Sequence, residues 1–216
     1  MNSPYLTRLL LAGTALFTAC NTPQILAHKA DNGDPIAQYR FAVMILDTPS
    51  ATLQNKQRAI AHLKNSTEAG NRNAPALLAR CYITGNGTST NLKEAVKYLK
   101  IASDRDNFRA QLLLAHFYAN GLGTPPCPLK SVDEIRYAAM QGSPQAAELM
   151  FLCFYDGFGV PRNTDLALGW LENAAEYGSE PAQLLLTLAK NDKNAPNFDE
   201  NVNLLKKKLD FFPKNR

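Results

Sequence analysis

The feature that most constrains this chain is an internal repeat of 36 residues. Glycines recur at this step in two parallel series, which are Gly85, Gly121 and Gly157, and Gly87, Gly123 and Gly159. Alanines keep the same step at Ala74, Ala110, Ala146 and Ala182. A period of roughly 20–50 residues is typical of architectures in which similar structural units stack on one another. The repeat therefore predicts a stacked array rather than a single irregular domain.

Each unit has the pattern of two helices. In one unit Ala110, Leu114 and Phe117 recur at steps of four and three residues, which is typical of a helix with one buried face. The glycines that follow end this helix, because glycine readily adopts the left-handed conformation found after a helix. A second helix is predicted over residues 131–141, and a Gly-Ser-Pro turn at residues 142–144 leads into the next unit. No alternating stretch predicts a strand, so the sequence predicts an all-α chain.

The pattern Ala-x3-Leu-x3-Tyr-x2-Gly-x-Gly, followed by Ala-x3-Leu-x2-Ala, resembles the Sel-one-like repeat, a relative of the tetratricopeptide repeat. The unit that carries it consists of Ala74, Leu78, Tyr82, Gly85, Gly87, Ala95, Leu99 and Ala102. The resemblance is good over residues 72–181 and weaker on both flanks. It implies an α–α superhelix, a right-handed solenoid of helix-turn-helix repeats, that works as a binding scaffold rather than an enzyme.

The predicted organisation has three parts. Residues 1–19 form a signal peptide, residues 20–29 a linker and residues 30–216 the repeat solenoid. The predicted units of the solenoid are residues 37–73, 74–109, 110–145 and 146–181, with a C-terminal cap at 182–216. We expect the cap to end in an amphipathic helix that directs Val202, Leu205 and Leu209 inward.

The first twenty residues resemble the signal of a bacterial lipoprotein. Arg8 supplies a positive charge, residues 9–17 form a short apolar run, and Thr18 and Ala19 lead to Cys20. The apolar run is too short to cross a hydrocarbon core of about 30 Å. The resemblance implies that Cys20 is acylated and anchors the chain to a membrane, the periplasmic face of the outer membrane in a Gram-negative host. An ordinary secretory signal is the alternative.

Three further cysteines, Cys81, Cys127 and Cys153, are too few for a dense disulfide framework. Cys81 and Cys153 hold equivalent repeat positions, and Phe117 stands at the same position between them. This exchange favours a packing role over a nucleophile paired with His116. A disulfide between Cys127 and Cys153 is left open.

Nothing in the sequence predicts a catalytic, cofactor or metal site. The three histidines have no Asp, Cys or Ser at a spacing typical of a catalytic triad or a metal site. No CxxC pair indicates zinc. The Gly-x-Gly motif follows a helix rather than a strand, which excludes a dinucleotide-binding fingerprint. The net charge of +4 is too small to indicate a nucleic-acid partner.

A contact surface is the remaining candidate for function. In tetratricopeptide relatives the first helix of each unit lines the concave face, and a peptide segment of a protein partner is its natural ligand. By that resemblance the contact residues are Asn73, Arg80, Thr84, Arg109, His116, Asn120, Gln145, Glu148, Tyr155 and Asp156. Two alternatives stay open. One is a peptidoglycan-binding or peptidoglycan-active envelope protein that uses Glu148 with Asp156, and the other is a secreted effector or immunity-type protein.

Overall fold

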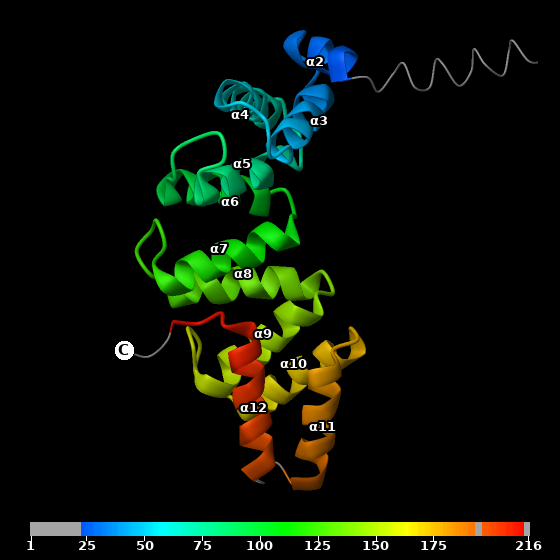
Figure 1. Cartoon of the computed structure of the whole chain (residues 1–216). Helices are drawn as coiled ribbons and strands as arrows, with labels where there is room; N and C mark the ends of the chain where they lie inside the picture. The colour runs from blue at the N-terminus through cyan, green and yellow to red at the C-terminus, as the bar shows by residue number, and fades with distance from the viewer. Residues whose placement is uncertain (1–22, 193–195, 214–216) are drawn as a thin grey trace, which may run out of the picture. The chain divides into compact units, whose positions relative to one another are not determined.

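The structure is a computed structural model that describes residues 23–192 and 196–213. Every regular element in that part of the chain is an α-helix, which confirms the predicted all-α class (Figure 1). The chain divides into two compact units, residues 1–91 and 92–216. The first contains α2 (Pro23–Asp31), α3 (Pro35–Leu46), α4 (Leu53–Glu68) and α5 (Ala74–Thr84). The second contains α6 (Leu92–Ser103), α7 (Phe108–Asn120), α8 (Pro128–Met140), α9 (Pro144–Asp156), α10 (Thr164–Glu176), α11 (Glu180–Asp192) and α12 (Pro196–Leu209).

In the first unit a helix occupies the stretch that the sequence predicts as a linker. Helix α2 begins at Pro23 and packs against α3, with Ala30 fully buried between them. Asp31 at its end forms an ion pair with Arg58 of α4. This corrects the predicted linker for residues 23–29, while residues 20–22 lie outside the described residues. The segment has no repeat glycines, but Leu26, Ala27 and Ala30 share one helix face that is at least half-buried, while Ile25 is exposed.

The two glycines of each loop have different structural tasks. Gly85, Gly121 and Gly157 end α5, α7 and α9 in the left-handed conformation, which glycine adopts at little cost. The second glycine lies against the backbone of a helix from the preceding repeat. A Cβ atom at residue 123 would lie 2.4 Å from the carbonyl oxygen of Leu92, and one at residue 159 would lie 2.6 Å from that of Pro128. These contacts fix how closely consecutive repeats approach.

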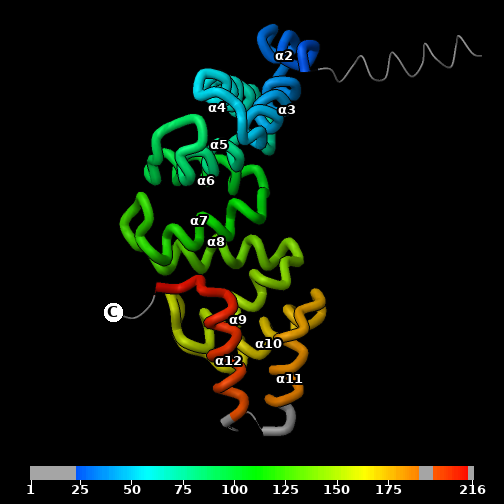
Figure 2. The backbone as a smooth tube through the Cα atoms, in the orientation of Figure 1, coloured from blue at the N-terminus to red at the C-terminus, as the bar shows by residue number. Residues whose placement is uncertain are grey.

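Alanines fill the closest contacts inside each unit, as the sequence predicts. In the second unit Ala138 of α8 and Ala174 of α10 are both fully buried. Larger apolar side chains, among them Phe151 and Leu171, fill the space around them and have no exposed surface. Figure 2 shows α7 and α8, and then α9 and α10, as successive helix pairs.

We expect Ala138→Leu and Ala174→Leu each to lower the free energy of unfolding by about 1–3 kcal/mol, because neither site has room for three more carbon atoms. Urea unfolding followed by circular dichroism measures the change. Tyr137→Leu is the matched control, since its side chain is 60% exposed on the same helix as Ala138. An unchanged midpoint for both alanine variants would contradict this account of helix packing.

The C-terminal helix α12 matches the predicted amphipathic cap in its inward residues. Val202 and Leu205 are 1% and 2% exposed, and Leu209 is half-buried. However, α12 packs beside α11 and its Lys206 pairs with Asp156 of α9, and Phe211 after it contacts His116 of α7 (Figure 2). Among the helices of the described residues, none combines the length and the apolar character that crossing a membrane requires.

Candidate functional site: a groove beside the C-terminal helix

Three predicted contact residues lie in the first unit and are exposed. Arg80 places its guanidinium 3.3 Å from the carboxylate of Asp47, and the Thr84 hydroxyl donates a hydrogen bond to the Arg80 carbonyl oxygen. Asn73 precedes α5 and makes no side-chain capping bond there. The Arg80–Asp47 pair is open to solvent, where ion pairs contribute little to stability. These residues form a polar surface with no enclosed site of their own.

The predicted contact residues of the second unit divide into three groups. Arg109 and Gln145 are exposed, as expected for a contact surface. His116 and Asn120 of α7, together with Tyr155 and Asp156 of α9, all contact the chain's own C-terminal segment, residues 196–213. Glu148 is only 5% exposed.

The buried position of Glu148 corrects its assignment to the contact surface. Its carboxylate accepts a hydrogen bond from the Ser179 hydroxyl, and the same hydroxyl oxygen accepts a bond from the Ala182 amide at the start of α11. The carboxylate therefore joins α9 to the next repeat. The residue borders a pocket of about 560 Å³ between α9 and α11, but its carboxylate is already bonded to the Ser179 hydroxyl.

The C-terminal segment is held at Phe211 by two side chains of α7. His116 Nδ1 lies 2.9 Å and Asn120 Nδ2 lies 3.0 Å from the Phe211 carbonyl oxygen. Because a carbonyl can only accept, His116 carries its proton on Nδ1 here. The Phe211 ring packs edge-on against the His116 ring, with 5.4 Å between the ring centres. Sequence reasoning selected both α7 residues but not the segment that they hold.

A second contact joins α12 to Tyr155. The Tyr155 ring packs between Phe151 and Phe198, and its hydroxyl donates a hydrogen bond to Asp199. Burial of the ring, and after it the bond to Asp199, raise the pKa of Tyr155 to about 12. The phenol therefore stays protonated at neutral pH and acts as a fixed hydrogen-bond donor.

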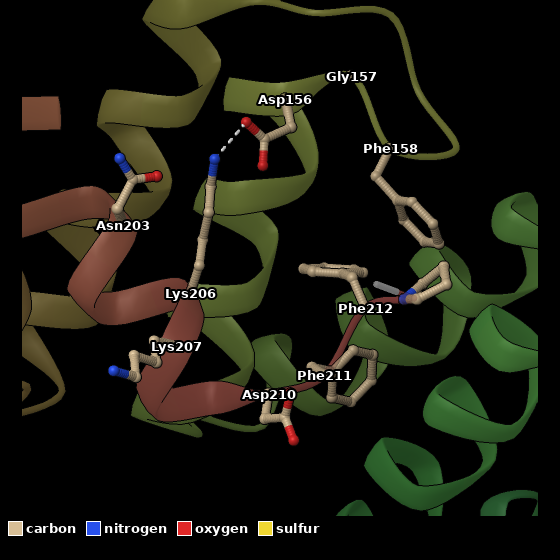
Figure 3. A pocket seen from close by; sticks show the side chains of 10 residues that line it. Asp156, Gly157, Phe158, Asn203, Lys206, Lys207, Asp210, Phe211 and Phe212 are labelled. Atoms are coloured by element: carbon tan, nitrogen blue, oxygen red, sulfur yellow. Dashed lines mark hydrogen bonds and ion pairs between the residues drawn. The ribbon is translucent and has the colours of Figure 1, made fainter. Parts of the chain in front are cut away.

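Between α9 and the C-terminal segment lies a groove of about 830 Å³. Figure 3 shows an ion pair within it, in which Lys206 Nζ lies 2.7 Å from Asp156 Oδ1. Phe158 and Phe212 also line the groove, with ring centres 4.5 Å apart. The full lining is Asp156, Gly157, Phe158, Asn203, Lys206, Lys207, Asp210, Phe211, Phe212 and Pro213. The groove thus combines aromatic surface with both signs of charge.

The thiols of the described residues are unreactive or isolated. Cys81, Cys127 and Cys153 are all free, so the structure does not pair Cys127 with Cys153. Burial raises the pKa of Cys81 to about 11 and that of Cys153 to about 12. A thiol with so high a pKa holds almost no thiolate at neutral pH and is a poor nucleophile. Across the described ranges no three His, Cys, Asp or Glu side chains are grouped as metal ligands would be.

Most of the groove was not predicted from the sequence. Phe158 lies between two repeat glycines, and Lys206, Phe211 and Phe212 lie in the segment that was expected only to cap the array. The available signal was the adjacent pair Phe211-Phe212 directly after an amphipathic helix, since two consecutive aromatic residues cannot share that helix's buried face.

The Sel1 repeat family matches four stretches of the chain, residues 35–71, 74–107, 108–132 and 144–179. A protective antigen of uropathogenic Escherichia coli with an SLR fold superposes with a TM-score of 0.69 at 25% identity. That match covers 85% of this chain, which spans 41% of the antigen's chain.

A Sel1 repeat protein from Oxalobacter formigenes superposes with a TM-score of 0.67 at 23% identity, over 86% of this chain and 78% of that one. No curated protein matches the chain. The structural likeness confirms the predicted α–α superhelix. Since the repeats cover more than half of its length, the chain belongs to the Sel1 repeat family.

Proposed function

We propose that the chain is a non-catalytic scaffold that binds a protein partner in the groove beside α12. Sel1 repeats form scaffolds typical of protein–protein interaction, and this chain has that architecture. The groove carries the more specific proposal. Its volume of about 830 Å³ suits several side chains of a peptide segment, and its aromatic walls and charged rim are the surfaces that such segments contact.

Phe158 is the residue on which we expect partner binding to depend most. It is half-buried in the loop between α9 and α10, and its ring lines the groove. Removing an aromatic anchor from the centre of an interface typically costs about 2 kcal/mol or more, which is about thirtyfold in affinity. Phe158→Ala is therefore expected to weaken partner binding about thirtyfold while leaving the helical content unchanged.

The experiment needs the partner first. A photo-crosslinking amino acid at Asn203, which lines the groove, is expected to give a discrete adduct in cells of the native host. The same group at Tyr137 of α8, whose side chain is exposed away from the groove, is the control. The captured protein is then titrated against wild type, Phe158→Ala and Tyr137→Ala by calorimetry. Loss of affinity in Tyr137→Ala alone would place function on another surface. Hydrolysis of peptidoglycan by the wild type, lost in Asp156→Asn, would replace the scaffold by an enzyme.

We also propose that acylation of Cys20 tethers this scaffold to the cell envelope. Cys20 lies outside the described residues, and the support is the lipoprotein-like sequence around it. Cys20→Ser is expected to abolish labelling by radioactive palmitate and to leave an uncleaved precursor, because acylation requires the thiol. Immunoblots of membrane and soluble fractions measure the outcome, with Cys127→Ser as the matched control. A Cys20→Ser protein that matures and fractionates like the wild type would refute the anchor.

A further inference from the structure

The C-terminal segment shows which kind of ligand the second unit is built to hold. We propose that the surface formed by His116, Asn120 and Phe158 is a receptor for an extended segment with two adjacent aromatic residues, supplied by a protein partner. The chain's own Phe211-Phe212 pair occupies this receptor and competes with the partner. The inference rests on the proposed function and deepens it by stating the chemistry of the partner.

The backbone is the first feature that the receptor recognises. His116 Nδ1 and Asn120 Nδ2 both donate to the Phe211 carbonyl oxygen, at 2.9 and 3.0 Å. The two side chains come from successive turns of α7, and Asn120 is oriented by a further bond to the His116 carbonyl oxygen. The Phe211 carbonyl is free to accept both bonds because it lies beyond the end of a helix, where carbonyl groups have no intrahelical partner. Helix α12 does end just before this point, at Leu209.

The side chains are the second feature. Phe211 packs on the His116 ring, and Phe212 packs on the Phe158 ring with 4.5 Å between ring centres. The two rings also contact each other edge-on, with 5.2 Å between their centres, so together they form one aromatic cluster that reaches both His116 and Phe158. Aromatic pairs at these distances attract one another beyond the effect of their buried area. A segment with a single aromatic residue would leave one of the two contacts unfilled.

The Asp156 carboxylate favours a segment with a basic residue on the N-terminal side of its aromatic pair. Lys206 stands one helical turn before the tail and pairs with Asp156 at 2.7 Å. Lys207 lines the same groove, and both belong to a run of three lysines. A partner segment with a basic residue about five positions before its aromatic pair would reproduce both the ion pair and the ring contacts.

The chain's own tail, residues 210–213, is held weakly enough for a partner segment to displace it. Asp210 connects α12 to the aromatic pair with φ of 40°, a left-handed conformation that non-glycine residues rarely adopt. Phe212 is half-buried and Pro213 is exposed, so the end of the tail is held on one side only. The groove beside it is open, which lets an incoming segment make contacts before the tail has left.

The test uses the full chain and a defined probe, a fluorescent peptide with the sequence of residues 204–216. Its binding is followed by fluorescence anisotropy to wild type and to the double variant Phe211→Ala/Phe212→Ala, whose own tail lacks both rings. If the tail fills the receptor nine-tenths of the time, the double variant binds the peptide about tenfold more tightly than the wild type. Adding His116→Ala and Asn120→Ala to the double variant is expected to abolish binding. A peptide with both phenylalanines replaced by alanine is the matched control.

A measurement on the unaltered protein guards against a variant that fails to fold. Excess unlabelled peptide is expected to raise the rate of amide hydrogen exchange at residues 211 and 212 of the wild type. The control peptide, with alanine in place of both phenylalanines, is expected to leave that rate unchanged. Equal peptide affinity in wild type and double variant, or unchanged exchange in the wild type, would overturn the proposal. So would a wild-type dimer that dissociates in the double variant, because the occupant would then be a second copy of the chain. A crosslinked partner at Asn203 together with no peptide binding would leave the proposed function standing and reject this inference alone.

Discussion

Gly123→Ala is expected to lower the free energy of unfolding by about 2–5 kcal/mol. An alanine at a left-handed position costs roughly 1–2 kcal/mol, and Gly123 has φ of 66°. Its new Cβ would also lie 2.4 Å from the backbone carbonyl of Leu92, so α6 would have to move away. Forced overpacking of this kind typically costs about 1–3 kcal/mol. The two costs arise at the same atom and are expected to add.

Gly142→Ala separates these two costs. Gly142 has φ of 82°, and a Cβ there would meet nothing within 4 Å. This variant is therefore expected to lose only the backbone contribution, about 1–2 kcal/mol of the free energy of unfolding. Urea unfolding of both proteins, with Gly87→Ala as a second member of the close-contact class, measures the difference. Equal losses for Gly123→Ala and Gly142→Ala would show that contact with the preceding repeat contributes nothing.

Ser179→Ala has the second large expected effect, a loss of about 1.5–5 kcal/mol in the free energy of unfolding. The Ser179 hydroxyl caps the start of α11 and donates to the buried carboxylate of Glu148. Loss of a cap costs about 0.5–2 kcal/mol. Leaving a buried carboxylate without its hydrogen-bond donor costs a further 1–3 kcal/mol or so. The variant combines both losses.

Ser143→Ala is the matched control, because Ser143 caps α9 in the same way, with its hydroxyl oxygen accepting a hydrogen bond from the Ala146 amide. It is expected to lose only the capping contribution, about 0.5–2 kcal/mol. Thermal unfolding of the two variants measures how much stability each has lost relative to the wild type. If Ser179→Ala is no more destabilised than Ser143→Ala, then the Glu148 contact does not support the repeat junction.

The periodic part of the structure was predictable because one physical rule applies at every repeat. Helix pairs, left-handed glycines and buried alanines recur at fixed steps, so each unit supports the interpretation of the next. Small errors came from local signals. The helix predicted over residues 131–141 begins at Pro128, because proline suits the first turn of a helix.

The non-periodic part could not be predicted in the same way. The contact between His116 and Phe211 spans 95 residues, far more than the 36-residue step of the repeat. The pattern placed His116 on a contact face, but nothing local shows that the chain's own end returns to it. Glu148 was misassigned for a related reason. Its burial depends on Ser179, 31 residues away, and a carboxylate without a known partner is normally expected at the surface.

The glycine contacts also explain where the array ends. The second glycine of each Gly-x-Gly loop lies against a helix of the preceding repeat, so these loops connect consecutive repeats. The last glycine in the sequence is Gly178, and no such loop follows α11. Without this backbone contact nothing holds α12 at the next position of the periodic stack, and it packs against earlier helices of the second unit instead. Three Gly-x-Gly loops thus mark the most regular part of the array, and after the last of them the chain folds back, so that Lys206 of α12 pairs with Asp156 of α9.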